Sequence, residues 1–597
     1  MKIAGIICAI LLAGSAWAYG GVKSTPRLDG ALRTTAAGEP IMLWVFFADK
    51  GSSAYRRGAV PPDVVTQRSL DRRAMVRAPG DLVDETDLPP EPSYVAAVAP
   101  LVLSIRHASK WFNGVSVMAT PEQISSLEAL PFVRCIDIVY RHGRPGDRER
   151  IEQPVAAPPA GLSRTVGTHA LDYGPSLAQV SLENIPAVHD SGNSAQGIII
   201  GVFDNGFRML AHQAFDSLRS RIVGTYDFVD HKVSVAPLHP GHGYHGVNTL
   251  STLAGYYPGR LIGPAYGASF ILARTENDSS ETPVEEDNWV RAIEWADSLG
   301  VQITSTSLGY FSYLPPFTSS SWTWQDMDGN TTLITRAADM AVGKGILVVN
   351  SAGNERLERG GLPNTLNAPA DGDSVLSVGA VTPQGTLASF SSYGPTADGR
   401  IKPEVMAVGT SIYAADGGSA TGYVVTQGTS FSCPLTAGVA ALVLKAHPLA
   451  TPMQIINALK KTASRTNTPD NDYGWGIVNA AAAIAYLRGD TLPPVPPQSF
   501  ALGQNYPNPF NPGTRIDIQL PEAASLTLKV YDMLGREVRV LLEGAFAPSS
   551  TIPYRATWDG TDNTGRRLAS GVYLYRLDAK GASGNAFTQV RRMILLR

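Results

Sequence analysis

The chain has 597 residues, of which 44% are hydrophobic and 17% charged, and its formal net charge is −3. This length exceeds what one hydrophobic core supports and predicts three or four domains. The balance of 49 basic against 52 acidic side chains argues against a nucleic-acid or polyanion binder. A protein or small-molecule substrate is the better expectation.

The first residues have the pattern of a secretory signal. Lys2 is followed by an apolar run from Ile3 to Leu12 and then by small residues that end in Ala16-Trp17-Ala18, which are the three regions of such a signal. The run is too short to span a bilayer. We therefore expect residues 1–18 to be a signal peptide that is cleaved after Ala18 on export.

Residues 19–160 contain a small module over about 41–140. Thr120, followed by Pro121 and Gln123, is typical of a helix that begins with a capping box. Apolar runs around this helix predict strands over Ile41–Ala48, Gly114–Met118 and Arg134–Val139. These elements form a compact α+β module, and the charged, then Pro- and Ala-rich stretch after it predicts an exposed linker.

Residues 165–487 alternate predicted strands with predicted helices. The apolar run Gly197–Phe203 is typical of a parallel strand covered on both faces, and Trp289–Leu299 predicts a helix that ends at Gly300. The alternation continues with a strand over Val301–Ser307, a helix over Thr331–Val342 and strands over Gly345–Val349 and Ser374–Val381. This pattern predicts an α/β domain built on a doubly wound parallel sheet.

A second composition change occurs near residue 490. The Pro-rich segment Thr491–Gln498 predicts a linker over 488–498. Beyond it, residues 499–597 contain segments that alternate apolar with polar side chains: Arg515–Leu520, Leu526–Tyr531 and Val572–Leu577. These segments predict a small C-terminal β-sandwich.

Two polar residues lie where elements of the α/β domain begin or end. Asp204 follows the strand that ends at Phe203, at the sheet edge where such folds place their sites. It could orient an imidazole, although Asp-Asn-Gly is also common in tight turns. Ser430 precedes a buried helix, close to unpaired backbone N–H donors and the positive end of the helix dipole, where serine is also an ordinary cap.

Two histidines compete for the role of base, because His242 and His245 are both followed by glycine. The residues after His245 recur at helical spacing and end at Gly255, which places His245 at the N-terminus of a buried helix. His242 would then be a loop residue near the site. The pattern favours His245 as the residue that exchanges protons.

Asn354 follows Ser351-Ala352-Gly353 just beyond a predicted strand. Its amide could donate a hydrogen bond to a tetrahedral oxyanion. The alternative is a turn at the end of a strand.

Six segments between residues 197 and 445 together resemble the subtilisin-like serine proteases (subtilases). They are IIIGVFDNGF, HGVNTLSTLAG, SLGY, VVNSAGNE, ASFSSYGPTADGRIKPEVMAVG and GTSFSCPLTAGVAALV. The resemblance implies a serine endopeptidase in which Asp204 orients His245 and Ser430 forms an acyl-enzyme. It also implies that Asn354 donates to the oxyanion.

The same resemblance implies a substrate-binding cleft. Two segments would flank an extended substrate by strand addition: Ser307, Leu308 and Gly309, and Ser351, Ala352 and Gly353. Asn367 aligns with the floor of the primary specificity pocket. Its neutral side chain argues against a strict preference for Lys or Arg.

Two positions depart from the family pattern, Val247 and Asn205, where the family usually has Thr, and Thr or Ser, respectively. The four chemical groups remain, but a catalytically silent surface binding protein and an esterase stay open as alternatives. The chemistry requires no cofactor. Structural calcium is common in the family, yet no Asp-x-Asp-x-Asp-Gly loop is present, so no metal ligands are assigned.

The flanking regions also resemble known modules. Residues 41–140 resemble the inhibitory propeptide of subtilases, with an unrelated domain as the alternative, and this resemblance implies a zymogen. The string Gln504–Pro512, with Trp558-Asp559-Gly560 and Arg591–Leu596, resembles the sorting domain of type IX (Por) secretion cargo. It implies outer-membrane secretion machinery as a partner and a secreted or cell-surface protein that passes through the periplasm.

Overall fold

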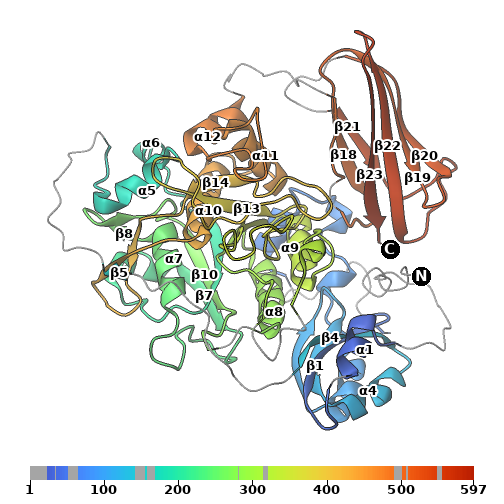
Figure 1. Ribbon diagram of the computed structural model, residues 1–597, viewed down its shortest axis with the longest axis horizontal. Helices are drawn as coiled ribbons and strands as arrows, with labels where there is room; N and C mark the ends of the chain where they lie inside the picture. The colour runs from blue at the N-terminus through green and yellow to red at the C-terminus, as the bar shows by residue number, and fades with distance from the viewer. Residues whose placement is uncertain are drawn as a thin grey trace. The chain divides into compact units, whose positions relative to one another are not determined.

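The computed structural model describes residues 23–33, 35–51, 65–141, 155–156, 169–279, 282–313, 321–489, 500–505, 508–547 and 554–596. These residues divide into two compact units, Lys23–Arg488 and the chain from Gly489 onward (Figure 1). The predicted signal peptide and most of the predicted 488–498 linker lie outside the described residues.

The N-terminal module of the first unit is a four-stranded antiparallel sheet in the order β2-β3-β1-β4. Its elements are α1 (Pro26–Leu32), β1 (Ile41–Phe47), β2 (Ser104–Ser109), β3 (Gly114–Ala119), α4 (Pro121–Glu128) and β4 (Val133–Arg141). The expected capping box at Thr120 and Gln123 is present. The α+β prediction for this module is confirmed.

Strand β1 is apolar at every position because both of its faces are covered. Leu43 and Val45 lie in the core of the module itself. Met42 and Trp44 lie on the other face, in a cluster with Val284 and Leu333 of the α/β domain. The second face of this sheet is therefore an interface within the unit.

The segment between β1 and β2 folds into short helices that the sequence pattern did not predict. They are α2 (Gln67–Arg73), η2 (Pro79–Asp81), η3 (Glu85–Asp87), α3 (Pro92–Val98) and η4 (Ala99–Leu101). The arginines at the end of α2 are buried, so this helix shows no simple apolar stripe in the sequence.

The α/β domain has the expected doubly wound parallel sheet. Its seven strands lie in the order β14-β13-β12-β11-β6-β10-β7, and each recorded pair is parallel. The strands are β6 (Ile199–Asp204), β7 (Ile222–Asp227), β10 (Ser269–Arg274), β11 (Ile303–Thr306), β12 (Leu347–Ser351), β13 (Leu376–Val381) and β14 (Val405–Val408). Strand β6 is buried along its whole length, as its continuous apolar run predicted.

Helices cover both faces of this sheet (Figure 1). Helices α7 (Tyr244–Ala254) and α10 (Thr429–Ala446) pack together on one face, and α8 (Val284–Leu299) and α9 (Leu333–Gly343) pack together on the other. Helix α10 is long and apolar enough to cross a membrane, but 83% of it is buried inside the unit. It is the central core helix.

Shorter elements complete the domain. They are α5 (Leu177–Ser181), α6 (Ile185–Asp190), α11 (Pro452–Thr462), α12 (Ala480–Arg488), the pair β8 (Tyr256–Tyr257) and β9 (Leu261–Ile262), and the hairpin β15 (Ile412–Ala415) and β16 (Tyr423–Thr426). The short strand β5 (Val155–Ala156) pairs with β16. Helix α8 begins at Val284, five residues before the predicted start, because its charged first turn is buried rather than exposed.

The C-terminal unit is a β-sandwich, as predicted. One sheet has the order β17-β18-β21 and the other the order β20-β19-β22-β23. The strands are β17 (Ala501–Leu502), β18 (Thr514–Gln519), β19 (Ala524–Tyr531), β20 (Glu537–Phe546), β21 (Tyr554–Trp558), β22 (Gly571–Gly581) and β23 (Ala586–Leu595).

The Asn- and Pro-rich string at the start of this unit has a structural role. The backbone N–H of Asn505 donates to the Tyr575 hydroxyl at 2.8 Å, and the Asn508 side chain accepts from the Ile594 N–H at 2.8 Å. Phe510 is buried, with its ring centroid 5.5 Å from that of Trp558. These residues hold the N-terminal segment of the unit against its sheets.

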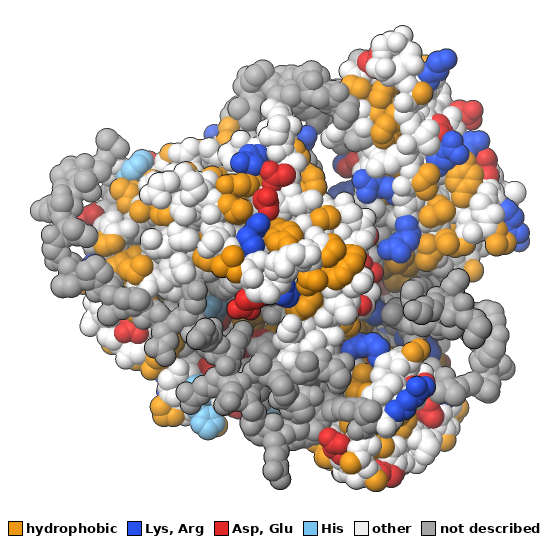
Figure 2. All heavy atoms as spheres, viewed as in Figure 1, with side chains coloured by type: hydrophobic (Ala, Val, Ile, Leu, Met, Phe, Trp, Pro, Cys, Tyr) orange, Lys and Arg blue, Asp and Glu red, His pale blue; other side chains and the backbone are white. Residues whose placement is uncertain are grey.

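Charges of both signs are interspersed on the visible surface. Figure 2 shows Lys and Arg side chains beside Asp and Glu, with apolar side chains between them. This distribution agrees with the small net charge of the chain.

We expect Phe510→Ala to destabilise only the C-terminal unit. Removing a buried Phe ring costs about 3–5 kcal/mol, and Phe510 lies within the core of that unit. Calorimetry should therefore show one unfolding transition at lower temperature and the other unchanged. Met533→Ala, at a side chain that is 63% exposed, is the control. An equal shift of both transitions would contradict the division into two units.

Candidate active site

The site begins at the carboxyl end of β6, where Asp204 is completely buried. One carboxylate oxygen accepts hydrogen bonds from His245 Nδ1 at 2.7 Å and from the Asn205 backbone N–H at 2.8 Å. The other oxygen accepts from the Thr249 hydroxyl at 2.8 Å. A buried carboxylate needs such partners to stay ionised, so Asp204 is a fixed acceptor for the imidazole.

His245 is the second residue of α7, and its side chain is 21% exposed. The imidazole thus lies between a buried carboxylate and solvent, where a group that exchanges protons must lie. His242 does not contact Asp204, and its Nδ1 lies 3.9 Å from Asp278 Oδ2. The structure therefore brings His245, and not His242, to Asp204.

Glycine at position 246 is required for this contact. A Cβ there would lie 2.2 Å from the Gly206 carbonyl oxygen and 3.1 Å from Asp204 Cβ. Any side chain would push α7 away from β6. The His-Gly dipeptide thus reflects the close approach of the helix to the end of the strand.

Ser430 is the second residue of α10, after Gly428, whose φ of +143° favours glycine. Its hydroxyl lies 3.3 Å from the Ser307 carbonyl oxygen. At this position the hydroxyl is close to backbone N–H groups that have no partner inside the helix, and to the positive end of the helix dipole.

Pro434 lies inside α10 rather than in its first turn. A proline has no N–H to donate to the carbonyl four residues earlier, and that carbonyl belongs to Ser430. The Ser307 hydroxyl donates to it instead, at 2.7 Å. This bond ties the segment after β11 to the start of α10.

Cys433, three residues after Ser430, is a second side chain with nucleophilic chemistry in this helix. It is completely buried, and its thiol contacts the carbonyls of Thr306 and Val349 at 3.3 and 3.5 Å. Burial raises the pKa of the thiol to about 12, which keeps it protonated and unreactive. Cys433 is thus a core residue.

Asn354 lies beside the start of α10. Its side-chain oxygen accepts hydrogen bonds from the Thr429 backbone N–H at 2.9 Å and from the Thr429 hydroxyl at 3.0 Å. These bonds fix the orientation of the amide and leave its NH₂ group as the donor. The arrangement can supply a donor to an oxyanion formed at Ser430.

The two predicted substrate-binding segments follow neighbouring parallel strands, β11 and β12. Ser307, Leu308 and Gly309 come directly after β11, and Asn350 Nδ2 holds the Leu308 carbonyl at 3.0 Å. Ser351 is the last residue of β12, and Ala352 and Gly353 follow it. Adjacent strands thus present both segments at the same edge of the sheet.

Asn367 is buried between these segments. A Cβ at Gly309 would lie 2.7 Å from Asn367 Cβ, and one at Gly353 would lie 3.1 Å from Asn367 Nδ2. The Asn367 amide donates to Glu355 at 3.0 Å and accepts from Arg359.

The pair Glu355 and Arg359 was not found from the sequence. The two side chains form an ion pair at 3.1 Å, and the Arg359 guanidinium lies 3.7 Å from the centroid of the Phe311 ring. The two residues lie in a turn in which the Arg359 backbone N–H donates to the Glu355 carbonyl at 2.8 Å, and no helical pattern in the sequence marks the contact. The neutral Asn367 is therefore held by a charged pair.

A second face of the α/β domain is covered by the N-terminal module. Trp44 Nε1 donates to Asp287 at 2.6 Å, and burial raises the pKa of this carboxyl to about 6. Asp297 forms ion pairs with Arg72 and Arg73 of α2. Burial acts to raise the pKa of Asp297, but the two guanidinium groups outweigh it and the pKa is lowered.

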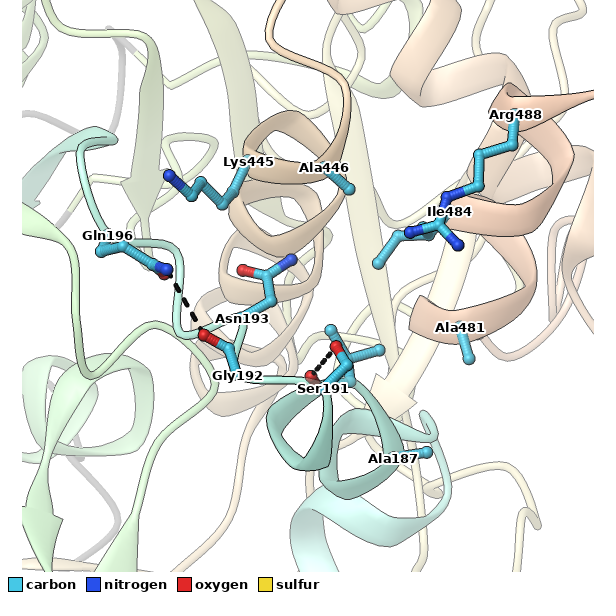
Figure 3. Close-up of a pocket in the computed structure, with 11 residues that line it drawn as sticks. Ala187, Ser191, Gly192, Asn193, Gln196, Lys445, Ala446, Ala481, Ile484 and Arg488 are labelled. Carbon is cyan, nitrogen blue, oxygen red and sulfur yellow. Dashed lines mark hydrogen bonds between the residues drawn. The ribbon is translucent and has the colours of Figure 1, made fainter.

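A hollow of about 410 Å³ lies elsewhere on the first unit, among α6, α10 and α12 (Figure 3). Gln196 Nε2 donates to the Gly192 carbonyl at its edge, at 3.3 Å. Its other lining residues are Ala187, Val188, Ser191, Asn193, Lys445, Ala446, Ala481, Ile484 and Arg488. None of the candidate site residues lines it.

Within the described part of the chain, no group of three or more His, Cys, Asp or Glu side chains could hold a metal ion. Calcium ligands are therefore not assigned.

Two regions of the chain match families of known proteins. The model of the subtilase family matches residues 195–476, and that of the Peptidase S8 propeptide domain of Bacteroidota matches residues 42–153. Subtilisin DY of Bacillus licheniformis is 32% identical over 312 residues, which cover 51% of this chain and 99% of that protein. Subtilisin NAT of Bacillus subtilis subsp. natto is 30% identical over 316 residues, covering 53% and 73% of the two chains.

Among solved structures, a protease from Pseudoalteromonas arctica PAMC 21717 matches with a TM-score of 0.42 and 24% identity, covering 53% of this chain and 97% of that one.

The comparisons correct the sorting-domain prediction for the C-terminal unit. Residues 504–583 match the FlgD Ig-like domain. The string that suggested a sorting signal contains Asn505, Asn508 and Phe510, which hold the N-terminal segment of this unit against its sheets. Packing of an Ig-like domain thus accounts for these residues, and type IX sorting is not assigned.

We expect the Cys433 thiol to be unreactive in the folded protein. At pH 8 a thiol with a pKa near 12 is protonated, and burial excludes the reagent. Labelling by 5,5′-dithiobis(2-nitrobenzoate) should give the same result for the native protein and for its Cys433→Ser variant. In guanidinium chloride the unsubstituted protein should show one further thiol. Labelling of native Cys433 would contradict its placement in the core.

Proposed function

Because the chain belongs to the subtilase family of serine peptidases, we propose that it is a serine endopeptidase whose triad is Asp204, His245 and Ser430. The observation that carries this proposal is the 2.7 Å hydrogen bond between His245 Nδ1 and the buried carboxylate of Asp204. With Nδ1 bound to the carboxylate, Nε2 is the ring nitrogen through which His245 would take a proton from the nucleophile, and Ser430 begins the helix packed against α7.

In this mechanism the Ser430 hydroxyl attacks the carbonyl carbon of a peptide bond while His245 takes its proton. The resulting oxyanion accepts hydrogen bonds from Asn354 Nδ2 and the Ser430 backbone N–H. His245 returns the proton to the leaving amine, and the acyl-enzyme forms. A water molecule then attacks the acyl-enzyme with the same proton transfers through His245, which releases the carboxylic acid and restores the Ser430 hydroxyl. Asp204 stays ionised and stabilises the imidazolium.

We place the substrate in extended form between the segment Ser307–Gly309 and the segment Ser351–Gly353, with its main specificity side chain directed toward Asn367. The support is that these segments follow adjacent strands and that Gly309 and Gly353, which have no side chains, let Asn367 lie directly beside both segments. The charged pair behind Asn367 is internally neutralised, which supports the expectation that the pocket has no strict preference for Lys or Arg.

The N-terminal propeptide domain acts, in this proposal, as an inhibitor that the enzyme removes from itself. Its support is the continuous interface between that module and α8, in which Trp44 and α2 satisfy buried carboxylates of the α/β domain. The signal pattern over residues 1–18 supports export, with a secreted or cell-surface location.

We expect Ser430→Ala to abolish peptide hydrolysis and to leave the purified precursor with its propeptide uncut. The substitution removes the nucleophile without disturbing the buried helix around it. Intact-mass analysis and N-terminal sequencing check the processing.

Covalent labelling of Ser430 by an organophosphorus probe in the active protein excludes a catalytically silent binding protein. Rates on matched peptide and ester substrates separate a peptidase from an esterase.

Asn354→Leu should mainly lower kcat, because the donor acts on the oxyanion and not on the bound substrate. Loss of one oxyanion-hole donor costs about 10²–10³ in kcat, a scale measured on the corresponding asparagine of a subtilisin. Steady-state kinetics on a chromogenic peptide give kcat and KM separately. A change confined to KM would make Asn354 a binding residue instead.

A further inference from the structure

Two buried side chains beside the triad have no role in the chemistry described so far. Asn205 follows Asp204 directly and is 6% exposed. The side chain of Asp278 is 7% exposed and lies four residues beyond the end of β10, the strand paired with β6. Both therefore lie at the edge of the sheet that carries the site.

The two side chains form a chain of hydrogen bonds to the first turn of α7. Asn205 Oδ1 accepts from the Gly246 backbone N–H at 3.0 Å. Asn205 Nδ2 donates to one oxygen of Asp278, and the other oxygen accepts from the Gly243 backbone N–H at 2.7 Å. Both ends of the turn that carries His245 are thus held.

Helix α7 cannot supply this cap from its own N-cap residue. That residue is Gly243, which has φ +76° and no capping side chain, and a Cβ there would lie 2.7 Å from Pro237 Cδ. An uncapped first turn leaves backbone N–H groups without partners. Asn205 reaches Gly246 and Asp278 from two different atoms of its amide, whereas the single hydroxyl of Ser or Thr would have to make both contacts from one oxygen.

The backbone that carries Asn205 is itself fixed. The buried Arg274 donates through Nε to the carbonyls of Asn205 and Glu276, at 3.1 and 3.2 Å. Its Nη1 forms ion pairs with Asp227 and Asp230 at 3.0 and 2.8 Å. The hydrogen-bond chain therefore starts from a rigid point.

We propose that Asn205 and Asp278 are positioning residues for His245. They hold the first turn of α7 against Asp204, and the Asp278 carboxylate stabilises the imidazolium that forms on His245 during catalysis. This inference rests on the proposed function, since it assumes that His245 is the base.

The electrostatics of Asp278 agree with this role. Burial raises its pKa, while the hydrogen bonds from Gly243 and Asn205 and the imidazoles of His242 and His245 favour its ionised form. By reciprocity, the carboxylate favours protonation of those imidazoles. The other charged or titratable groups that act on this cluster are Asp204, Arg208, His239 and Arg274.

An exchange of the two side chains tests the hydrogen-bond chain. Asn205→Asp alone removes the donor and places two carboxylates in contact, and we expect kcat to fall about 100-fold. In the double variant Asn205→Asp with Asp278→Asn, the amide at 278 donates to the carboxylate at 205. The backbone N–H groups of Gly246 and Gly243 again have side-chain oxygens to which they can donate, so all three bonds are restored. We expect this double variant to recover kcat to within about fivefold of the unsubstituted enzyme. A double variant no better than Asn205→Asp overturns the positioning role.

The pH profile tests the charge. Asp278→Asn removes a negative charge near His245, which lowers the pKa of the imidazole, so the acid limb of kcat/KM should move to lower pH by about 0.5 unit. We expect kcat to fall about tenfold and KM to stay within about twofold. An unmoved acid limb together with unchanged kcat overturns the electrostatic role.

Asp190→Asn is the matched control. Asp190 also accepts from a histidine and a backbone N–H, His169 Nδ1 at 2.7 Å and Ala170 N–H at 2.8 Å, but it precedes β6 and lies away from the carboxyl end of the sheet. Its kcat and acid limb should not change.

Titration of active sites with the organophosphorus probe distinguishes a failure of the proposed peptidase function from a failure of the positioning role alone. An unsubstituted enzyme that fails to react overturns the proposed function and this inference with it. A reactive enzyme whose variants at Asn205 and Asp278 match it in kcat and pH profile overturns this inference alone. If Asn205→Asp does not fold, Asn205→Thr takes its place, with an expected three- to tenfold loss of kcat at unchanged KM, and unchanged kcat there counts against the inference.

Discussion

The geometry of the site depends on how closely the start of α7 approaches the end of β6. Gly246 lies so near Gly206 that a single Cβ would meet its carbonyl oxygen at 2.2 Å. This approach lets Asp204 be fully buried and still accept from His245, Thr249 and its own neighbour. A buried carboxylate without those partners would cost several kcal/mol and take up a proton. Hydrogen bonds from two segments, the end of β6 and helix α7, thus hold one buried acceptor in place.

The same rule governs the opposite face of the sheet. Helix α8 carries Asp287 and Asp297 at buried positions, and their partners come from the propeptide module, 170 or more residues earlier in the chain. Neither element satisfies its polar groups alone. The module is therefore a structural complement of α8 and not a loose cover over it.

Sequence patterns predicted the elements whose packing is local. The continuous apolar run of β6, the helical spacing after His245 and the capping box at Thr120 all identified their elements, because period and cap are properties of neighbouring residues. The first turn of α8 and helix α2 were missed because their charged residues are buried by partners far away in the chain.

Within the site, Asp204, His245, Ser430 and Asn354 were predicted from their positions near the ends of strands and helices together with the resemblance to the subtilases, since each position alone also fitted a turn or a helix cap. The contact between Asn205 and Asp278 was not predicted, since a bond between two polar side chains 73 residues apart leaves no periodic signal. A short string such as that around Phe510 does not distinguish a sorting signal from a structural segment, because the same residues can pack within a domain or be recognised by a partner.

Pro434 has a mechanical consequence. An ordinary residue there would donate its N–H to the Ser430 carbonyl and complete the helix internally. With proline, that carbonyl accepts from Ser307, a residue of the segment along which the substrate is proposed to lie. A movement of the nucleophile is thereby coupled, through one hydrogen bond, to a movement of that segment.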